Sequence, residues 1–193
     1  TWIIIQDPSP GDFTFLEENY KIHPLTLKEI QKPTLRPKVD DLGNHLYMVL
    51  HFPVFNPKER KTHGQELDLI MTHDTIITVH YGSFDALDIL IEKIQNDRDY
   101  REIFFQRQAG ILLYNLISYF LNLSLRQLDH ITLNLDHIET NLFRKQEEKL
   151  VKEISFVRRD ISGMSRTIKP MQSVLESLSL FGEKYFGAEF KPY

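Results

Sequence analysis

The sequence contains no cysteine, which excludes disulfide bonds, thiolate metal sites and cysteine nucleophiles. It also lacks a glycine-rich phosphate loop, a Gly-x-Ser-x-Gly elbow and a His-Glu-x-x-His pair, so the common signatures of nucleotide binding, ester hydrolysis and zinc proteolysis are missing. Catalysis therefore has no support from the residues, and we predict that the chain is not an enzyme. The cysteine-free composition fits a reducing compartment.

Strong charge of one sign and long hydrophobic runs are also scarce. The net charge is -4 over 193 residues, and no basic surface of the kind that binds nucleic acid is indicated. The most apolar run, residues 111–125, is interrupted by Asn115, Ser118, Asn122 and Ser124 and falls short of the roughly 20 apolar residues of a membrane span. We therefore predict a buried helix at this position, a soluble chain and no nucleic-acid partner.

Two apolar stripes dominate the second half of the chain. In residues 113–142, after two opening steps of four, apolar residues and Ser124 recur at steps that alternate between three and four. A second series in residues 154–178 alternates in the same way. This period places one apolar stripe along each helix. Because only the polar segment 144–149 separates them, we predict a long antiparallel helical hairpin whose arms cross at a shallow angle, as in coiled coils.

The second arm contains one internal proline and loses its apolar stripe before the end of the chain. Pro170 removes one backbone hydrogen bond, so we expect the helix to bend near Ile168. The stripe stops after Leu180, and Phe181-Gly182 with Phe186-Gly187 predicts a break before a further segment. The hairpin is therefore assigned to residues 109–182.

Both ends of the sequence suggest a fragment of a longer protein. Thr1 is not a methionine and is followed at once by a buried-strand pattern, while the chain stops at Tyr193 without an obvious finish. We expect residues 183–193 to lead into a further segment.

The first half of the chain mixes strands and helices. Strands are expected at residues 2–5, 45–52, 66–72 and 75–80, and helices at 13–20, 84–95 and 101–107, with one more between Pro24 and Pro33. Asp12 is the expected N-cap of the first helix. Residues 36–41 are expected to lead through a turn into the strand at 45–52, and 56–64 to form a loose connection. This order predicts an α/β or α+β class.

The histidines and paired carboxylates do not form a metal cluster. His45 and His51 share a strand face but lie roughly 20 Å apart, and His130 and His137 are about 10 Å apart along a helix. Neither pair can share one ion, although a single histidine could still be a ligand. The pair Asp40-Asp41 is interpreted as part of a turn rather than as a metal site.

Three blocks of the sequence stand out by their order and spacing. They are HPLTLKEI at residues 23–30, followed by RPKVD at 36–40 and HLYMVL at 45–50; ELDLI at 66–70 with IITVH at 76–80; and RRD at 158–160 with SRTIKP at 165–170. These blocks resemble the signature of the CorA family of divalent-metal transporters. One block alone would be weak evidence. Together, in order and spacing, they are fairly specific and cover nearly the whole chain.

This resemblance implies a fold and a role. The fold is α+β, with an α/β/α sandwich built on a mixed sheet in residues 1–108, followed by the helical hairpin. The role is that of the cytoplasmic regulatory domain, which senses metal and gates transport, of a homopentameric Mg²⁺/Co²⁺ transporter at the inner membrane. The membrane helices of such a protein are not in this sequence.

The resemblance also implies one site residue. In this family, hard cations bind between neighbouring subunits and are held by carboxylates, among them those on the helix that follows His-Pro-Leu. Glu29 matches an acidic position of that helix and is the predicted metal ligand, for Mg²⁺ and possibly Co²⁺, at an inter-subunit regulatory site. The preceding position, often acidic in the family, is Lys28 here, and a lysine beside Glu29 disfavours a dication.

Two alternatives are kept. The chain could be the cytoplasmic domain of a related Zn²⁺ transporter, at which the eight histidines hint, or a stand-alone cytosolic enzyme or interaction scaffold. By itself the chain is expected to be a monomer or a weak dimer, because the main pentamer contacts of the family lie in segments that this sequence does not contain.

Overall fold

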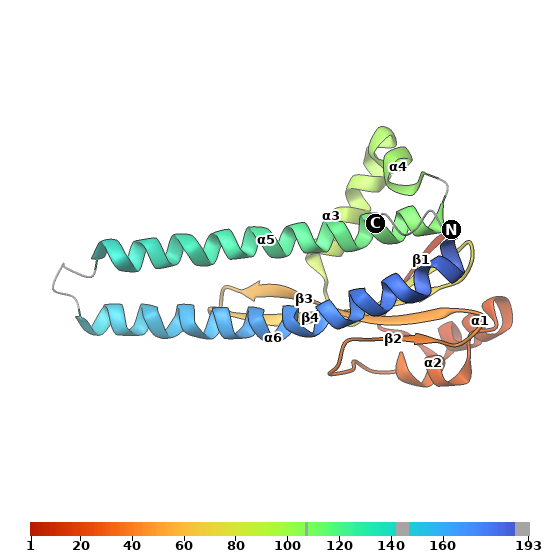
Figure 1. Ribbon diagram of the computed structural model, residues 1–193, viewed down its shortest axis with the longest axis horizontal. Coiled ribbons are helices and arrows are strands. Elements are labelled where there is room, and N and C mark those ends of the chain that lie inside the picture. Colours follow the sequence, from red (N-terminus) through yellow and green to blue (C-terminus); the bar gives the residue numbers. More distant parts are fainter. Residues whose placement is uncertain (107, 142–146, 188–193) are drawn as a thin grey trace.

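The computed structural model describes residues 1–106, 108–141 and 147–187 (Figure 1). Eleven elements are assigned in these residues: β1 (Trp2–Gln6), α1 (Pro10–Tyr20), α2 (Pro24–Glu29), β2 (Lys38–Asp41), β3 (Leu46–Asn56), β4 (Lys61–Met71), β5 (Ile76–His80), α3 (Asp85–Asn96), α4 (Arg98–Phe105), α5 (Ala109–Asn141) and α6 (Glu147–Phe186). Segment 142–146, which includes part of the predicted connection between the arms, lies outside the described residues, as do residues 188–193.

The strands form one five-stranded mixed sheet in the order β1-β5-β4-β3-β2. β1 runs parallel to β5, and all other neighbours are antiparallel. β3 and β4 make a long hairpin that pairs Leu46 with Met71 at one end and Asn56 with Lys61 at the other. Because successive side chains point to opposite faces, alternate residues of β4 serve two different layers.

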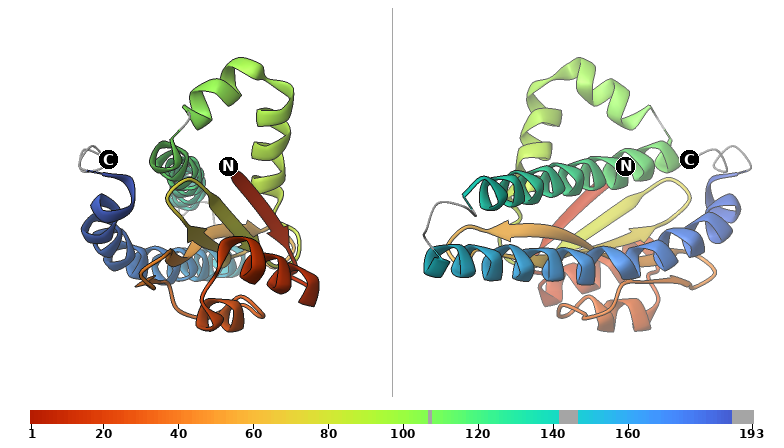
Figure 2. Two further views of the ribbon diagram at one scale, coloured as in Figure 1. Left: turned by 90° about the vertical axis from the view of Figure 1, so that its right-hand side faces the viewer. Right: turned by 60° about the vertical axis from the view of Figure 1, so that its left-hand side comes forward.

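Helices cover both faces of the sheet (Figures 1 and 2). On one face, α1 and α2 bury Leu16 and Ile30 against Tyr47 and Val79. On the other face, α3, α4, α5 and α6 close a larger cluster that includes Phe52, Phe120 and Met171. The predicted α+β sandwich with a mixed sheet is therefore confirmed.

The long helical hairpin is also confirmed, although its apolar stripes have two partners. α5 and α6 run antiparallel and side by side (Figure 1). Toward the tip of the hairpin, they pack on each other through Ile131, Ile138, Val157 and Met164. At the other end of the hairpin, residues of the same stripes belong to the core of the sheet. In the described parts of the chain, no helix combines the length and hydropathy needed to cross a bilayer, and Leu113 and Leu116 of the apolar run are buried.

Several element boundaries differ from the sequence-based prediction. The N-cap of α1 is Ser9, not Asp12: the Asp12 N–H donates to Ser9 Oγ, and the Asp12 carboxylate accepts from the Ser9 N–H at 2.8 Å, which is a capping box. β3 and β4 extend further than predicted, so that the loose connection shrinks to residues 57–60. Residues 38–41, expected only to lead into a turn, form the edge strand β2.

The predicted break falls at the second of the two glycine positions. α6 continues through Gly182 to Phe186 and ends before Gly187, whose φ of 83° suits glycine. The helix therefore extends beyond residue 182, where the hairpin was expected to end. Tyr185, near the end of the helix, is buried in the larger core cluster, so packing outweighs the low helix propensity of one glycine. Figure 1 shows α6 bending in its middle part, where Pro170 lies, as the missing backbone donor predicts.

Candidate functional site

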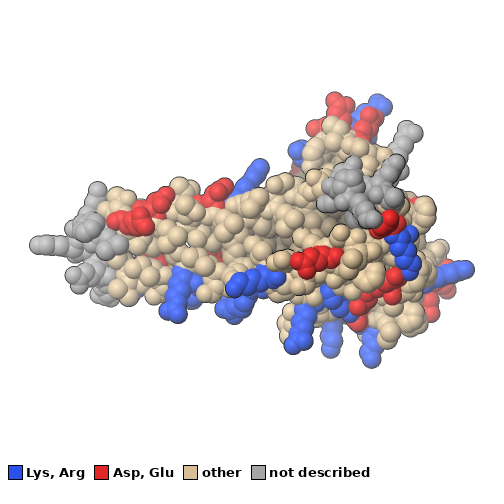
Figure 3. Space-filling model, viewed as in Figure 1, with Lys and Arg blue, Asp and Glu red and all other residues tan. Residues whose placement is uncertain are grey.

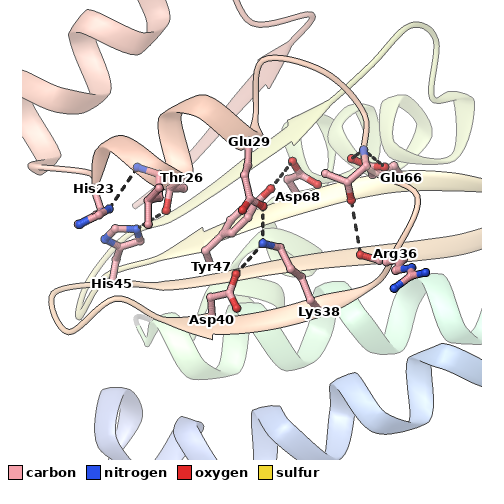
Figure 4. Close-up of polar contacts among 12 residues, drawn as sticks. His23, Thr26, Glu29, Arg36, Lys38, Asp40, His45, Tyr47, Glu66 and Asp68 are labelled. Atoms are coloured by element: carbon pink, nitrogen blue, oxygen red, sulfur yellow. Dashed lines mark hydrogen bonds and ion pairs between the residues drawn. The ribbon is translucent and has the colours of Figure 1, made fainter.

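The predicted ligand Glu29 is the last residue of α2, a six-residue helix laid over the sheet. The helix begins where the sequence predicts. His23 is its N-cap, with Nδ1 accepting from the Leu25 N–H at 3.1 Å, and Pro24 occupies the first position. Thr26 and Leu27 are buried beneath it. This anchoring directs the Glu29 side chain toward β2 (Figure 4).

Glu29 and Asp40 converge on one cation, the ammonium of Lys38 (Figure 4). The Lys38 ammonium contacts the Glu29 carboxylate and lies 2.6 Å from Asp40 Oδ2. Burial alone would lower the pKa of Lys38, but hydrogen bonds to Asp40 and Glu29 outweigh it and raise that pKa. All three side chains are 31–44% exposed, so this cluster opens to the surface. The cation that contacts Glu29 thus comes from β2 and is not its sequence neighbour Lys28.

A fully buried carboxylate, Asp68 of β4, lies beneath α2. The hydroxyls of Tyr47 and Tyr81 donate to Asp68 Oδ2 at 3.0 and 3.2 Å, while Oδ1 has no hydrogen-bond partner among the described residues. Burial, followed by the neighbouring charge of Glu66, raises the pKa of Asp68 to about 8. At neutral pH this group is therefore mostly a neutral acid. Burial in turn raises the pKa of both tyrosines.

Glu66 holds the segment that joins α2 to β2 against the sheet. Its two carboxylate oxygens each accept from the backbone N–H of Thr34 at 2.8 Å. His51 Nε2 lies 3.1 Å from Glu66 Oε2 and 3.1 Å from the Thr34 carbonyl. The Glu66 carboxylate is thus occupied by main-chain and imidazole donors.

The other histidines singled out in the sequence also have local partners. His45 is buried, with Nε2 2.9 Å from Thr26 Oγ1 and Nδ1 2.8 Å from Asn44 Oδ1. Burial lowers its pKa to about 4, so it is neutral at physiological pH. The His130 ring lies tilted against the Phe55 ring, with centroids 5.3 Å apart. Throughout the described ranges, no three His, Asp or Glu side chains are grouped so that they could hold a metal ion.

The resemblance singled out Glu29 as a metal ligand, which stays a prediction, but did not indicate which side chains lie beside it. Lys38 and Asp40 were not predicted to approach it, because an unrecognised edge strand brings them there. The chain supplies two convergent carboxylates, and a hard divalent cation prefers six or more oxygen ligands. Alone, this cluster is at most part of a metal site.

Comparison with known proteins reveals consistent likenesses. A family model described as "CorA-like Mg2+ transporter protein" matches residues 1–193. Over 118 residues the chain is 29% identical to the "Cobalt/magnesium transport protein CorA" of Thermotoga maritima, a match that covers 61% of this chain and 33% of that protein. The chain therefore spans about a third of the length of this relative.

Solved structures share the fold. The complete structure of the CorA magnesium transporter from Methanocaldococcus jannaschii superposes with a TM-score of 0.81 at 19% identity, over 99% of this chain and 59% of that one. The soluble domain of CorA from the same organism gives a TM-score of 0.77 at 19% identity, over 92% of this chain and 69% of that one.

Proposed function

The chain belongs to the family of CorA-like Mg²⁺ transporter proteins, and from this premise we propose that it is the regulatory domain of a divalent-cation transporter. In this proposal the domain senses Mg²⁺, and possibly Co²⁺, and gates transport. The parent protein is a homopentamer attached to the membrane through helices outside this chain, and the domain lies on the cytoplasmic face of the inner membrane.

The observation that carries the proposal is the convergence of Glu29 and Asp40 on the Lys38 ammonium at the surface. Two carboxylates that already share one cation form a pre-assembled half of a site for another cation. Carboxylate oxygens are the ligands that Mg²⁺ prefers. The remaining ligands would come from water and from a neighbouring copy, which makes the bound metal a bridge between subunits.

Lys38 sets the affinity of such a site. Without metal, its ammonium balances the two carboxylates; with metal, it has to leave, because a dication and an ammonium a few ångströms apart repel each other. This competition weakens metal binding relative to the same carboxylates without a lysine. A weakened site responds to changes in an abundant ion instead of staying saturated, which is what a sensor requires.

Gating then follows from linkage. A metal ion that bridges two copies stabilises the arrangement in which those copies are close, and its loss shifts the population toward an arrangement in which they separate. The shift can be no larger than the difference in metal affinity between the two arrangements.

Isothermal titration of the full-length protein with Mg²⁺ tests the ligand assignment. We expect Glu29→Gln and Asp40→Asn each to lower the affinity of one class of sites by about tenfold or more, since each removes one charged ligand. Lys38→Met should raise that affinity, and Lys28→Met should raise it less. Glu18→Gln, an exposed carboxylate on α1, is the matched control. Unchanged titrations for both Glu29→Gln and Asp40→Asn would remove this cluster from the metal site.

The alternatives gain less support. A Zn²⁺ site is expected to use imidazole ligands, but His45 and His51 are engaged within the fold and do not group with further ligands in the described residues. The family is one of transporters, which disfavours a stand-alone enzyme.

A further inference from the structure

Tyr47 of β3 contacts both polar groups of the α2 face, the surface cluster and the buried acid. Its hydroxyl donates to Oδ2 of Asp68 at 3.0 Å, and the Lys38 ammonium lies over its ring, 5.2 Å from the ring centre (Figure 4). Asp40, the other member of β2 in the cluster, is paired with Tyr47 across the two strands. The Tyr47 side chain is only 1% exposed, so it connects the surface cluster to the interior.

Asp68 is the group on this path whose charge can change. It is completely buried, and only its Oδ2 atom receives hydrogen bonds, from the hydroxyls of Tyr47 and Tyr81. Its Oδ1 atom has no partner in the part of the chain that the structure describes. Because local donors compensate its charge incompletely, its ionisation responds to charges that lie further away. Its raised pKa of about 8 places that ionisation near neutral pH.

The charges around Asp68 come from four elements and from the residue after β5. The groups that face it directly are Glu66, Tyr47 and Tyr81. Behind these lie His51 next to Glu66, and Lys38, Asp40 and Glu29 on the side of Tyr47. Burial raises the pKa of Tyr47, and the charges of Asp68 and Glu29 contribute to this shift. The charge of the surface cluster therefore reaches the hydroxyl that is bonded to Asp68.

We propose that cation binding at the Glu29–Asp40 cluster is coupled through Tyr47 to the ionisation of Asp68, so that the domain releases a proton as it takes up a divalent cation. This inference rests on the proposed function, which assigns the cluster to a dication. A dication that replaces the Lys38 ammonium adds one positive charge beside the Tyr47 ring, and this charge favours the ionised form of Asp68.

The coupling also acts in the opposite direction. If the bound cation favours loss of the proton, loss of the proton strengthens cation binding by the same factor. A rise in pH through the titration of Asp68 thus tightens the metal contact between neighbouring copies. Acidification weakens that contact, so it acts in the same direction as a fall in the concentration of the metal ion.

The size of the coupling follows from the distance between the charges. Lys38 lies over the ring of Tyr47 and Asp68 is bonded to its hydroxyl, so the ammonium and the carboxyl group are on the order of 10 Å apart, where partly buried charges are only weakly screened. One added unit charge at this distance shifts the ionisation of Asp68 by about half a pH unit. This shift corresponds to about 0.3 proton released at the midpoint and to an increase in metal affinity of about threefold across the titration.

Isothermal titration of the full-length protein with Mg²⁺ at pH 8, in two buffers that differ in their heat of ionisation, counts the released protons. We expect about 0.3 proton per bound ion for the original protein and a smaller release for Asp68→Asn, whose amide cannot ionise. Between pH 7 and pH 9, the affinity of the original protein should rise about threefold more than that of Asp68→Asn. Glu18→Gln, which changes an exposed carboxylate of α1, is the control and should release as many protons as the original protein.

A second measurement needs no metal. Carbon-13 NMR of the carboxyl groups follows the ionisation of Asp68 in the chain as the pH is raised. Lys38→Met removes the positive charge beside Tyr47, so it should move the midpoint of Asp68 upward by about half a pH unit. Lys28→Met removes an exposed lysine of α2 and should move this midpoint less.

These measurements separate a failure of the coupling from a failure of the metal site. If Mg²⁺ binding depends on Glu29 but releases no proton at pH 8, the coupling is overturned and the proposed function stands. A midpoint of Asp68 that stays unchanged in Lys38→Met would overturn the coupling as well. If neither Glu29→Gln nor Asp40→Asn alters the titration with Mg²⁺, the proposed function fails, and the coupling fails with it.

Discussion

The two faces of the sheet are built from the same strands but are stabilised by different chemistry. Under α1 and α2, β4 contributes the buried carboxylates Glu66 and Asp68, which accept from main-chain, imidazole and hydroxyl donors, although Asp68 Oδ1 has no partner among the described residues. Under α5 and α6, the alternate residues Leu67 and Leu69 join an apolar cluster. One face therefore depends on the protonation of its groups, whereas the other depends on the fit of its side chains.

This contrast comes from the strand period. In the run from Glu66 to Ile70, acidic and leucine residues alternate, and a period of two sends the acids to one layer and the leucines to the other. A change of size should thus disturb the hairpin face at every pH. A change of charge should disturb the α2 face in a manner that varies with pH.

The largest expected effect is on the hairpin face. In Gly163→Ala, the added Cβ of α6 would collide with the backbone carbonyl of Thr62, which cannot move away as a side chain could. We expect a loss of about 3 kcal/mol or more in the free energy of unfolding, equal at pH 5 and pH 9, measured by urea denaturation.

The control for that variant is Gly11→Ala on α1. A Cβ there meets only Ser9 Oγ, at 3.7 Å, so stability should change by less than about 1 kcal/mol. If both variants lose the same stability, close packing of α6 on β4 is not what makes the hairpin face sensitive to size.

The next effect is on the α2 face and varies with pH. The pKa of Asp68 is raised to about 8 in the fold, so between its ordinary value and about 8 the native chain holds a proton that the unfolded chain has lost. Its contribution to stability is full below about pH 4 and is lost as the pH rises through about 8. Tyr47, Glu66 and Tyr81 are the titratable groups that face it.

Asp68→Asn removes this dependence while keeping the shape of the neutral acid. Between pH 5 and pH 9, the variant should lose less free energy of unfolding than the original chain. The difference between the two losses should be on the order of a few kcal/mol. Urea denaturation at a series of pH values measures it. Parallel curves for the two proteins would show that Asp68 is ionised in the fold at neutral pH.

The smallest effect concerns Asp41, which joins an edge of the sheet to the end of α6. Its carboxylate accepts from Lys184 Nζ and from the Tyr185 hydroxyl, each at 2.6 Å. These bonds, with the Gly43 N–H, lower the pKa of Asp41 to about 2. The ionised Asp41 carboxylate contributes to the stability of the fold above its ordinary pKa, and this contribution is lost as the pH falls through about 2.

We expect Asp41→Asn to cost about 1 kcal/mol at pH 7, with part of the effect shared with Tyr185. A double-mutant cycle with Tyr185→Phe measures the shared part. If the stability losses of the two single variants add up in the double variant, the hydrogen bond between Tyr185 and Asp41 contributes nothing to the attachment of α6 to β2.

The sequence predicts the elements whose period is long and regular. The stripes of α5 and α6 extend over many turns, and their pairing follows from the polar connection between them. β2 was missed because a four-residue edge strand containing Lys38 and two aspartates has no apolar alternation to detect. The end of the hairpin was placed four residues early, at 182, because Gly182 also resembles a helix end, whereas α6 continues to Phe186 with Tyr185 buried.

The candidate site was only partly accessible from the sequence. Glu29 was placed by resemblance, and its role as a metal ligand stays a prediction. Its approach to Lys38 depends on the pairing of β2 with β3, which connects residues that no local pattern relates. The burial of Asp68 could have been suspected from an acid in the centre of an otherwise apolar strand, but its tyrosine partners come from two other segments.

The proline of α6 has a mechanical consequence. The helix is attached to β4 near Gly163 and to β2 through Lys184 and Tyr185, and Pro170 lies between these two attachments. Because Pro170 has no backbone N–H, one helical hydrogen bond is missing there, and the helix can bend at this point without breaking others. Because both attachments lie on the same sheet, the bend at Pro170 lets one continuous helix reach from β4 to the edge strand β2 and fasten both to each other.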